Sequence, residues 1–127
     1  MFKPQAAFSG FSVDDLDRAK TFYSESLGLK VDHDEMGLTI HLPHSDATIF
    51  VYPKDDHEPA TYTILNLVVD DIDEAADELA RNEVVFEHYE GLPADDKGIV
   101  RGRAAKRGPD IAWFKDPAGN ILSILQN

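Results

Sequence analysis

The chain contains no cysteine among its 127 residues. This absence excludes disulfide bonds, thiolate metal sites and cysteine nucleophiles. The sequence also lacks a run of about 18 apolar residues, the length that a membrane-spanning helix needs, and it lacks a charged, then apolar, then small-residue leader. We therefore expect a cytoplasmic protein that does not associate with membranes.

Basic residues are scarce, with 12 Lys and Arg against 24 Asp and Glu and a net charge of −12. A nucleic-acid-binding surface has to neutralise phosphates with Lys and Arg, so we expect no nucleic-acid partner. An acidic surface favours cationic ligands, but it also simply keeps a protein soluble, and both interpretations stay open. Five of the 12 basic residues nevertheless lie in one stretch without Asp or Glu, namely Lys97, Arg101, Arg103, Lys106 and Arg107.

A duplicated motif organises the chain. Residues 11–19, FSVDDLDRA, return in altered form as residues 67–75, LVVDDIDEA, at an offset close to half the chain length. Such a repeat predicts two copies of one module. Because half of this chain would bury too little surface to be stable alone, we expect the modules to share one domain. The predicted domain is 1–127, with modules at about 6–53 and 61–127 and a linker between them.

In each copy, two consecutive aspartates follow an apolar run of residues that favour a β-strand. Asp14 and Asp70 can accept hydrogen bonds from the first-turn amides of a following helix. Asp17 and Asp73, three residues later, complete the spacing of a capping box. Apolar residues then recur at helical spacing. The predicted helices cover 14–27 and 71–82.

Apolar and β-branched runs bounded by turn residues predict eight strands. These strands cover 6–13, 29–33, 38–42, 47–52, 61–69, 84–89, 110–114 and 120–126. Each module then reads strand, helix and three strands, which is an α+β arrangement. The segment 90–109 is rich in glycine and charge and is unusually long for a connection, so it is either a functional loop or lid or a plain solvated loop.

Two motifs lie at the ends of the two modules. The first is VDDLDRAKTFY at 13–23, followed by Leu27-Gly28-Leu29, and the second is WFKDPAGNIL at 113–122. Together they resemble the vicinal oxygen chelate superfamily, the group of glyoxalase I, the bleomycin-resistance proteins and the extradiol dioxygenases. The resemblance implies paired βαβββ modules that form a cup-shaped mixed β-sheet. It also implies that enzymes of this fold hold a divalent metal in the cup, through His, Gln or Glu on the first and last strands of each module.

Carried over through these motifs, the four metal-ligand positions fall on Phe8, Phe50, Ile64 and Ser123. Three of these residues have no donor atom, and a serine hydroxyl is a weak ligand for a dication. The comparison with the family pattern therefore predicts a metal-free site without a cofactor. The five histidines, which have no helical metal-binding spacing, are expected at the surface, except that His41 can face inward from a central strand; they are His33, His41, His44, His57 and His88.

If the four ligand positions face inward, the cup is apolar and aromatic. Apolar walls with a few polar groups suit a small, partly aromatic organic molecule, although the same residues can also pack as ordinary core. The predicted ligand pocket consists of Phe8, His41, Phe50, Tyr52, Ile64, Asn66, Trp113 and Ser123. The predicted lid or anion contact consists of Arg101, Arg103 and Arg107.

Metal-free members of this superfamily, the bleomycin-resistance-type proteins, act as dimers that sequester a drug. The resemblance therefore implies a homodimer that binds a small molecule, with a role in antibiotic resistance. One alternative is a glyoxalase-like lyase, an isomerase or a dioxygenase with an atypical site that draws on His41, His88, Glu87 or Glu90. Another is a structural or partner-binding module whose basic stretch, 97–107, docks on an acidic surface such as a second copy.

Overall fold

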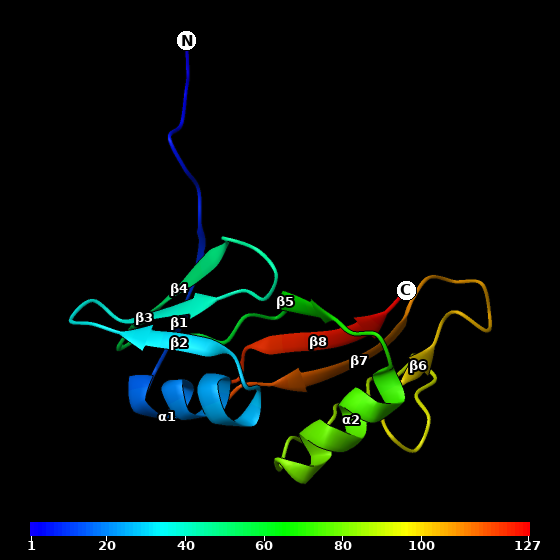
Figure 1. Cartoon of the computed structure of the whole chain (residues 1–127). Helices are drawn as coiled ribbons and strands as arrows, with labels where there is room; N and C mark the ends of the chain where they lie inside the picture. The colour runs from blue at the N-terminus through cyan, green and yellow to red at the C-terminus, as the bar shows by residue number, and fades with distance from the viewer. The chain divides into compact units, whose positions relative to one another are not determined.

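The computed structural model describes all residues from Met1 to Asn127 and divides into two compact units (Figure 1). Unit 1 is Met1–Glu58 and unit 2 is Pro59–Asn127. Each unit contains its own four-stranded sheet and its own helix, so the α+β class predicted from the sequence is confirmed.

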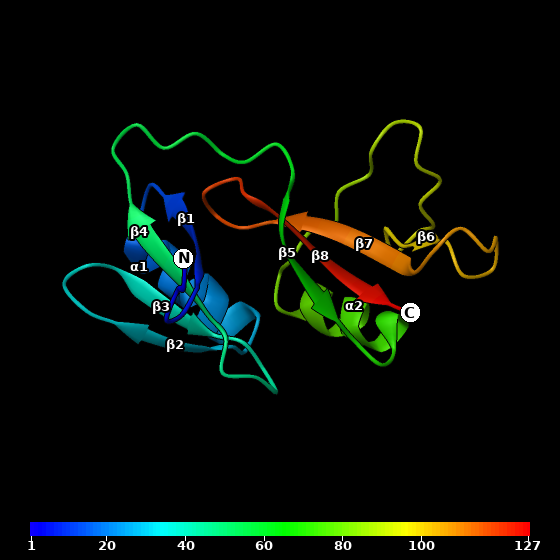
Figure 2. The same cartoon turned by 90° about the horizontal axis from the view of Figure 1, so that it is seen from above.

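Unit 1 has a mixed sheet with the strand order β1-β4-β3-β2. β1 pairs with β4 in parallel, whereas the other pairs are antiparallel. The helix lies across one face of this sheet (Figure 2). The elements are β1 (Ser9–Val13), α1 (Leu16–Thr21), the π-helical turn η1 (Phe22–Ser26), β2 (Lys30–His33), β3 (Leu38–His41) and β4 (Thr48–Pro53).

Unit 2 repeats this topology with the strand order β5-β8-β7-β6 and a parallel pair of β5 with β8. The shared strand order is what the duplicated motif predicts for two copies of one module. The elements are β5 (Thr63–Val68), α2 (Ile72–Arg81), β6 (Val100–Arg101), β7 (Asp110–Lys115) and β8 (Ile121–Gln126).

One face of each sheet is buried under its helix. In unit 1 Leu38, Ile40 and Val51 are fully buried on this face, and in unit 2 Phe114 and Leu122 are. Because side chains alternate across a strand, the residues between them lie on the opposite face, which we call the distal face. The distal faces therefore carry the residues that are not needed for the cores of the two units.

Both helices are capped one residue later than predicted. The residues that cap them are Asp15, which accepts from the Arg18 amide, and Asp71, which accepts from the Glu74 amide, instead of Asp14 and Asp70. Both capping residues have an extended backbone, as an N-cap position requires. The predicted capping box at Asp17 and Asp73 is therefore wrong. Either aspartate of each pair can cap a helix, so the sequence does not choose between them.

The first helix is also shorter than the predicted 14–27. It changes at Phe22 into η1, whose wider turn ends with the Leu27 amide donating to the Phe22 carbonyl. Two consecutive aromatic residues lie at this change, and Tyr23 is fully buried with its ring 5.8 Å from that of Phe11 on β1. The aromatic pair packs against the sheet here, and a π-helical turn at such a place is a known local adjustment of an α-helix.

The predicted strand at 84–89 is wrong. Only Phe86 forms a bridge, to Phe114, although the Glu87 amide also donates to the Trp113 carbonyl. The strand that pairs with the start of β7 is instead Val100–Arg101, inside the segment predicted to be irregular. Two short segments thus share the edge of β7. A hydrophobic pattern shows which residues suit a strand, but it does not show which segment reaches the neighbouring edge.

Candidate ligand-binding site

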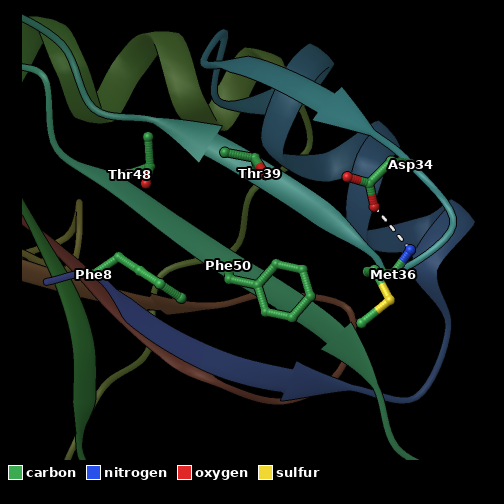
Figure 3. A pocket seen from close by; sticks show the side chains of 6 residues that line it. All are labelled: Phe8, Asp34, Met36, Thr39, Thr48 and Phe50. Atoms are coloured by element: carbon green, nitrogen blue, oxygen red, sulfur yellow. Dashed lines mark hydrogen bonds between the residues drawn. The ribbon is translucent and has the colours of Figure 1, made fainter. Parts of the chain in front are cut away.

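A pocket of about 400 Å³ lies on the distal face of unit 1 (Figure 3). The ring of Phe50 stands between Phe8 and Met36, and two threonine side chains lie along the neighbouring wall. This volume falls within the range of small-molecule sites, and most of the lining is apolar. The residues that line it are Phe8, Asp34, Met36, Thr39, Thr48 and Phe50.

Strand register places the pocket residues. Thr39 on β3 pairs directly with Phe50 on β4, so their side chains share a face, and His41 shares the same face through its pairing with Thr48. The Phe50 ring stacks on that of Tyr52 with a centroid distance of 6.0 Å. Of the predicted pocket residues in this unit, Phe8 and Phe50 line the cavity, whereas Tyr52 and His41 flank it.

The turn between β2 and β3 closes one end of the pocket. Asp34 Oδ1 accepts the Met36 amide at 2.8 Å and the Gly37 amide at 3.2 Å, and this fixes Met36 over the cavity. Three lining residues were not predicted from the sequence, namely Asp34, Met36 and Thr39. Alternation from His41 would have given Thr39, but the other two depend on the conformation of this turn.

His41 is half-exposed, and its Nε2 lies 2.7 Å from Asp32 Oδ2 on the adjacent strand. Asp32 pairs with Thr39 in the β2–β3 register, so the histidine and the carboxylate lie on the distal face beside the pocket. The imidazole of His41 therefore lies near the pocket, and the Asp32 carboxylate holds its orientation. Histidine is the side chain that most often accepts or donates protons in protein sites.

In unit 2 the predicted residues Asn66, Ser123 and Trp113 form one row across three strands. Ser123 on β8 is paired with Asn66 on β5 and with Trp113 on β7. Ile64 precedes Asn66 by two residues and so does not belong to this row, and the register shift between Thr63 and Leu65 leaves it without a partner. Thr63 lies beside the indole instead, and its Oγ1 accepts from Trp113 Nε1 at 3.1 Å. Such a bulge is not visible in the hydrophobic pattern.

The residues present do not fit the divalent metal of the fold family. Phe8, Phe50 and Ile64 carry no donor atom, and the Ser123 hydroxyl donates to Asn66 Oδ1. No three His, Cys, Asp or Glu side chains come together in a group that could hold a metal ion. No helix of the chain is long and apolar enough to cross a membrane.

The basic stretch is tied to carboxylates of its own unit. Arg101 binds both oxygens of Asp73 at 2.7 and 2.9 Å, and its Nε donates to Asp95 at 2.9 Å. Lys97 reaches Asp77 at 3.1 Å. The donors of Arg101 thus hold the stretch to α2, and Arg103 Nη1 lies 3.8 Å from Asp110 Oδ2. Arg107 is therefore the member of the predicted lid with charge to spare for an anion.

This ion-pair cluster predicts an acid-sensitive step in stability. The hydrogen bond from Arg101 lowers the pKa of Asp73 from 3.8 to about 2. A lowered pKa in the folded state stabilises the fold above the unfolded value and loses that contribution as the pH falls through the folded value. Replacing Arg101 with Met should therefore lower the urea midpoint at neutral pH, and its gap to wild type should shrink as the pH falls from about 4 to about 2.

Arg107→Met is the matched control, because no side-chain contact of Arg107 accompanies its backbone bond to Gly102. This variant should follow wild type across the same pH range. A gap between Arg101→Met and wild type that stays constant with pH would contradict the role of Asp73.

The sequence matches the family model described as the Glyoxalase/Bleomycin resistance protein/Dioxygenase superfamily over residues 7–124. The chain therefore belongs to this superfamily. No curated protein matches the sequence.

Solved structures share its fold over nearly the whole chain. TnmS3, an antibiotic binding protein from Streptomyces sp. CB03234, is 22% identical with a TM-score of 0.66, and 98% of each chain is covered. Lactoylglutathione lyase from Agrobacterium tumefaciens is 20% identical with a TM-score of 0.64, and the match covers 98% of this chain and 96% of that one. The fosfomycin resistance protein FosX from Listeria monocytogenes is 12% identical with a TM-score of 0.70, and the match covers 99% of this chain and 95% of that one. At these identities the likeness concerns the fold alone.

Proposed function

We propose that this protein binds a small, partly aromatic organic molecule in the pocket of unit 1 and holds it without chemical change. The observation that best supports this proposal is the pocket itself, where the side chains of Phe8, Phe50 and Met36 lie together on the distal face. Aromatic rings and a methionine thioether offer a large contact area to a flat ligand. Two threonine hydroxyls on the same wall supply the few polar contacts that orient a ligand.

The charge around the pocket favours a ligand with a cationic group. Asp34 lies at the rim and is exposed, and its Oδ1 is occupied by two backbone amides. The whole chain carries a net charge of −12, which attracts cations and repels anions. We therefore propose bleomycin-resistance-like sequestration of a cationic aromatic compound, with a role in antibiotic resistance. The antibiotic-binding TnmS3 supports this class of function among proteins of the same fold.

A thermal-shift screen of aromatic compounds, with cationic and neutral members matched in size, tests the proposal. We expect stabilisation that rises with ligand concentration, larger for cationic members, because a ligand that binds only the folded state raises the melting temperature. The compound should be recovered unchanged after incubation. A broad screen without any shift would overturn the proposal.

We also propose that the protein is a homodimer and that it acts in the cytoplasm. In this proposal the whole chain is one domain of two modules. Exposed apolar residues outside the pocket of unit 1 support an association between copies, since Val85 is 78% and Leu92 is 43% exposed. Light scattering checks this part, and a mass of one chain at all concentrations would reject it.

A second candidate is an enzyme that uses the pair of His41 and Asp32 beside the pocket. A histidine oriented by a carboxylate can act as a general acid or base, and such a group contributes about 100-fold or more to a rate. If the protein is a glyoxalase-like lyase, His41→Ala should lower turnover of lactoylglutathione by about 100-fold. His33→Ala is the control, because His33 lies on the neighbouring strand but on the other face. If the protein only binds its ligand, neither His41→Ala nor His33→Ala changes a rate, because there is no turnover to measure. His41→Ala should then leave the ligand affinity within about threefold of wild type.

A further inference from the structure

The distal face of unit 2 carries a hydrogen-bonding group that the fold fixes in one orientation. Ser123 is fully buried, and its hydroxyl donates to Asn66 Oδ1 at 2.5 Å. A serine hydroxyl has one proton, so this bond holds the amide oxygen of Asn66 toward β8. The Asn66 side chain is exposed, and its Nδ2 has no acceptor within the structure. The two N–H donors of the Asn66 amide are therefore already oriented, so a ligand that accepts from them does not have to order this side chain first.

Trp113 is fixed beside this group, but it has no donor left to offer. Its Nε1 already donates to Thr63 Oγ1, and an indole has only that one N–H. The Tyr89 ring meets the indole edge to face with a centroid distance of 5.8 Å. Trp113 can therefore contribute only the surface of its ring.

The spacing of the two groups sets the size of what fits them. Asn66 bonds to Ser123, so its amide leans toward β8, which is the strand next to Trp113. Asn66 on β5 and Trp113 on β7 are separated by β8, so the two residues lie two strand spacings apart, about 9.6 Å. An aromatic ring with a carbonyl group attached directly to it, together with an N–H···O bond of about 2.9 Å, covers much of this span. The nearby Lys115 is paired with Glu87 at 3.2 Å, so no unpaired charge favours an ionised group here.

We propose that Asn66 and Trp113 form a binding site for an aromatic ring that bears a neutral carbonyl oxygen, such as an aryl ketone or an aryl amide. The ring stacks on the indole, the carbonyl oxygen accepts from Asn66 Nδ2, and Ser123 acts as a positioning residue. This inference rests on the proposed function, because it names the chemical group of a ligand that this protein would hold. It concerns unit 2 alone and does not depend on the pocket of unit 1.

Acetophenone and ethylbenzene are suitable probes, because they differ mainly in the carbonyl oxygen. The chain contains a single tryptophan, so the one indole N–H resonance in a nitrogen-15 NMR spectrum reports on this face directly. We expect a saturating shift of this resonance with acetophenone at about fivefold lower concentration than with ethylbenzene, which corresponds to one net hydrogen bond. Asn66→Leu keeps the size of the side chain but removes the donor, so it should abolish the difference between the two probes.

Ser123→Ala should reduce the preference for acetophenone without removing it, because the amide is then free to rotate. In the wild-type protein, equal shifts with both probes, or no shift with either, would overturn the inference. This part of the test needs no variant. An indole resonance that moves with protein concentration alone would also overturn it, since a second copy would then cover the face. Phe50→Ala separates the two proposals, because it should leave these shifts unchanged while it weakens a ligand of the unit 1 pocket.

Discussion

Phe50→Ala should weaken the ligands found by thermal-shift screening about tenfold or more. The Phe50 ring forms the centre of the pocket wall, between Phe8 and Met36. Replacing the ring with a methyl group removes apolar contact between the pocket and the ligand. At about 25 cal/mol per Å², the lost contact is worth more than about 1.4 kcal/mol, which corresponds to about tenfold in affinity. A calorimetric titration of the same ligand into both proteins measures the effect.

Phe2→Ala is the matched control for Phe50→Ala. Phe2 is 87% exposed and does not line the pocket. This control should leave the affinity within about twofold of wild type. If Phe2→Ala and Phe50→Ala lose the same affinity, the ligand does not bind in the pocket of unit 1.

Gly37→Ala should lower the free energy of unfolding by about 3 kcal/mol, the largest loss that we expect from a single methyl group in this chain. Gly37 has a φ of 153°, and a Cβ built there would lie within 2.2 Å of the Val51 carbonyl oxygen. That oxygen belongs to the backbone of β4, so no side chain can move aside to make room. The added carbon would also come within 3.3 Å of the Phe50 ring.

Gly91→Ala tests the backbone effect alone. Gly91 also has a positive φ, 84°, but nothing lies within 4 Å of a Cβ built there. The cost of a left-handed conformation is about 1 kcal/mol, so this variant should lose far less stability than Gly37→Ala. Urea unfolding measures both. Equal losses would show that β3 can move away from β4 at no great cost, and the turn at 34–37 would then not be a rigid wall of the pocket.

The duplicated motif predicted the fold well because its signals are local. Aspartate pairs before apolar helical spacing indicate where strands end and helices begin, and the same pattern at both copies predicts two modules. The choice between Asp14 and Asp15 as the cap depends on backbone conformation, which composition does not determine. The strand predicted at 84–89 has a suitable pattern, yet β7 takes most of its edge pairing from Val100–Arg101.

The candidate site was predicted only in part for the same reason. Phe8 and Phe50 could be identified because the resemblance to the superfamily places metal-ligand positions on them. Asp34 and Met36 reach the pocket through a turn whose hydrogen bonds are not encoded in any periodic pattern. The bulge between Thr63 and Leu65 leaves Ile64 without a paired partner and brings Thr63 to the indole, and the sequence pattern does not show such a bulge.

The measurement that tests the central claim most directly is a calorimetric titration of the best ligand into protein before and after treatment with EDTA. We expect the same affinity in both titrations and a ligand that is recovered chemically unchanged, since no metal ligand set lies at the site. Loss of binding after EDTA, restored by Zn²⁺, Ni²⁺, Mn²⁺ or Fe²⁺, or conversion of the ligand into a product, would contradict this claim.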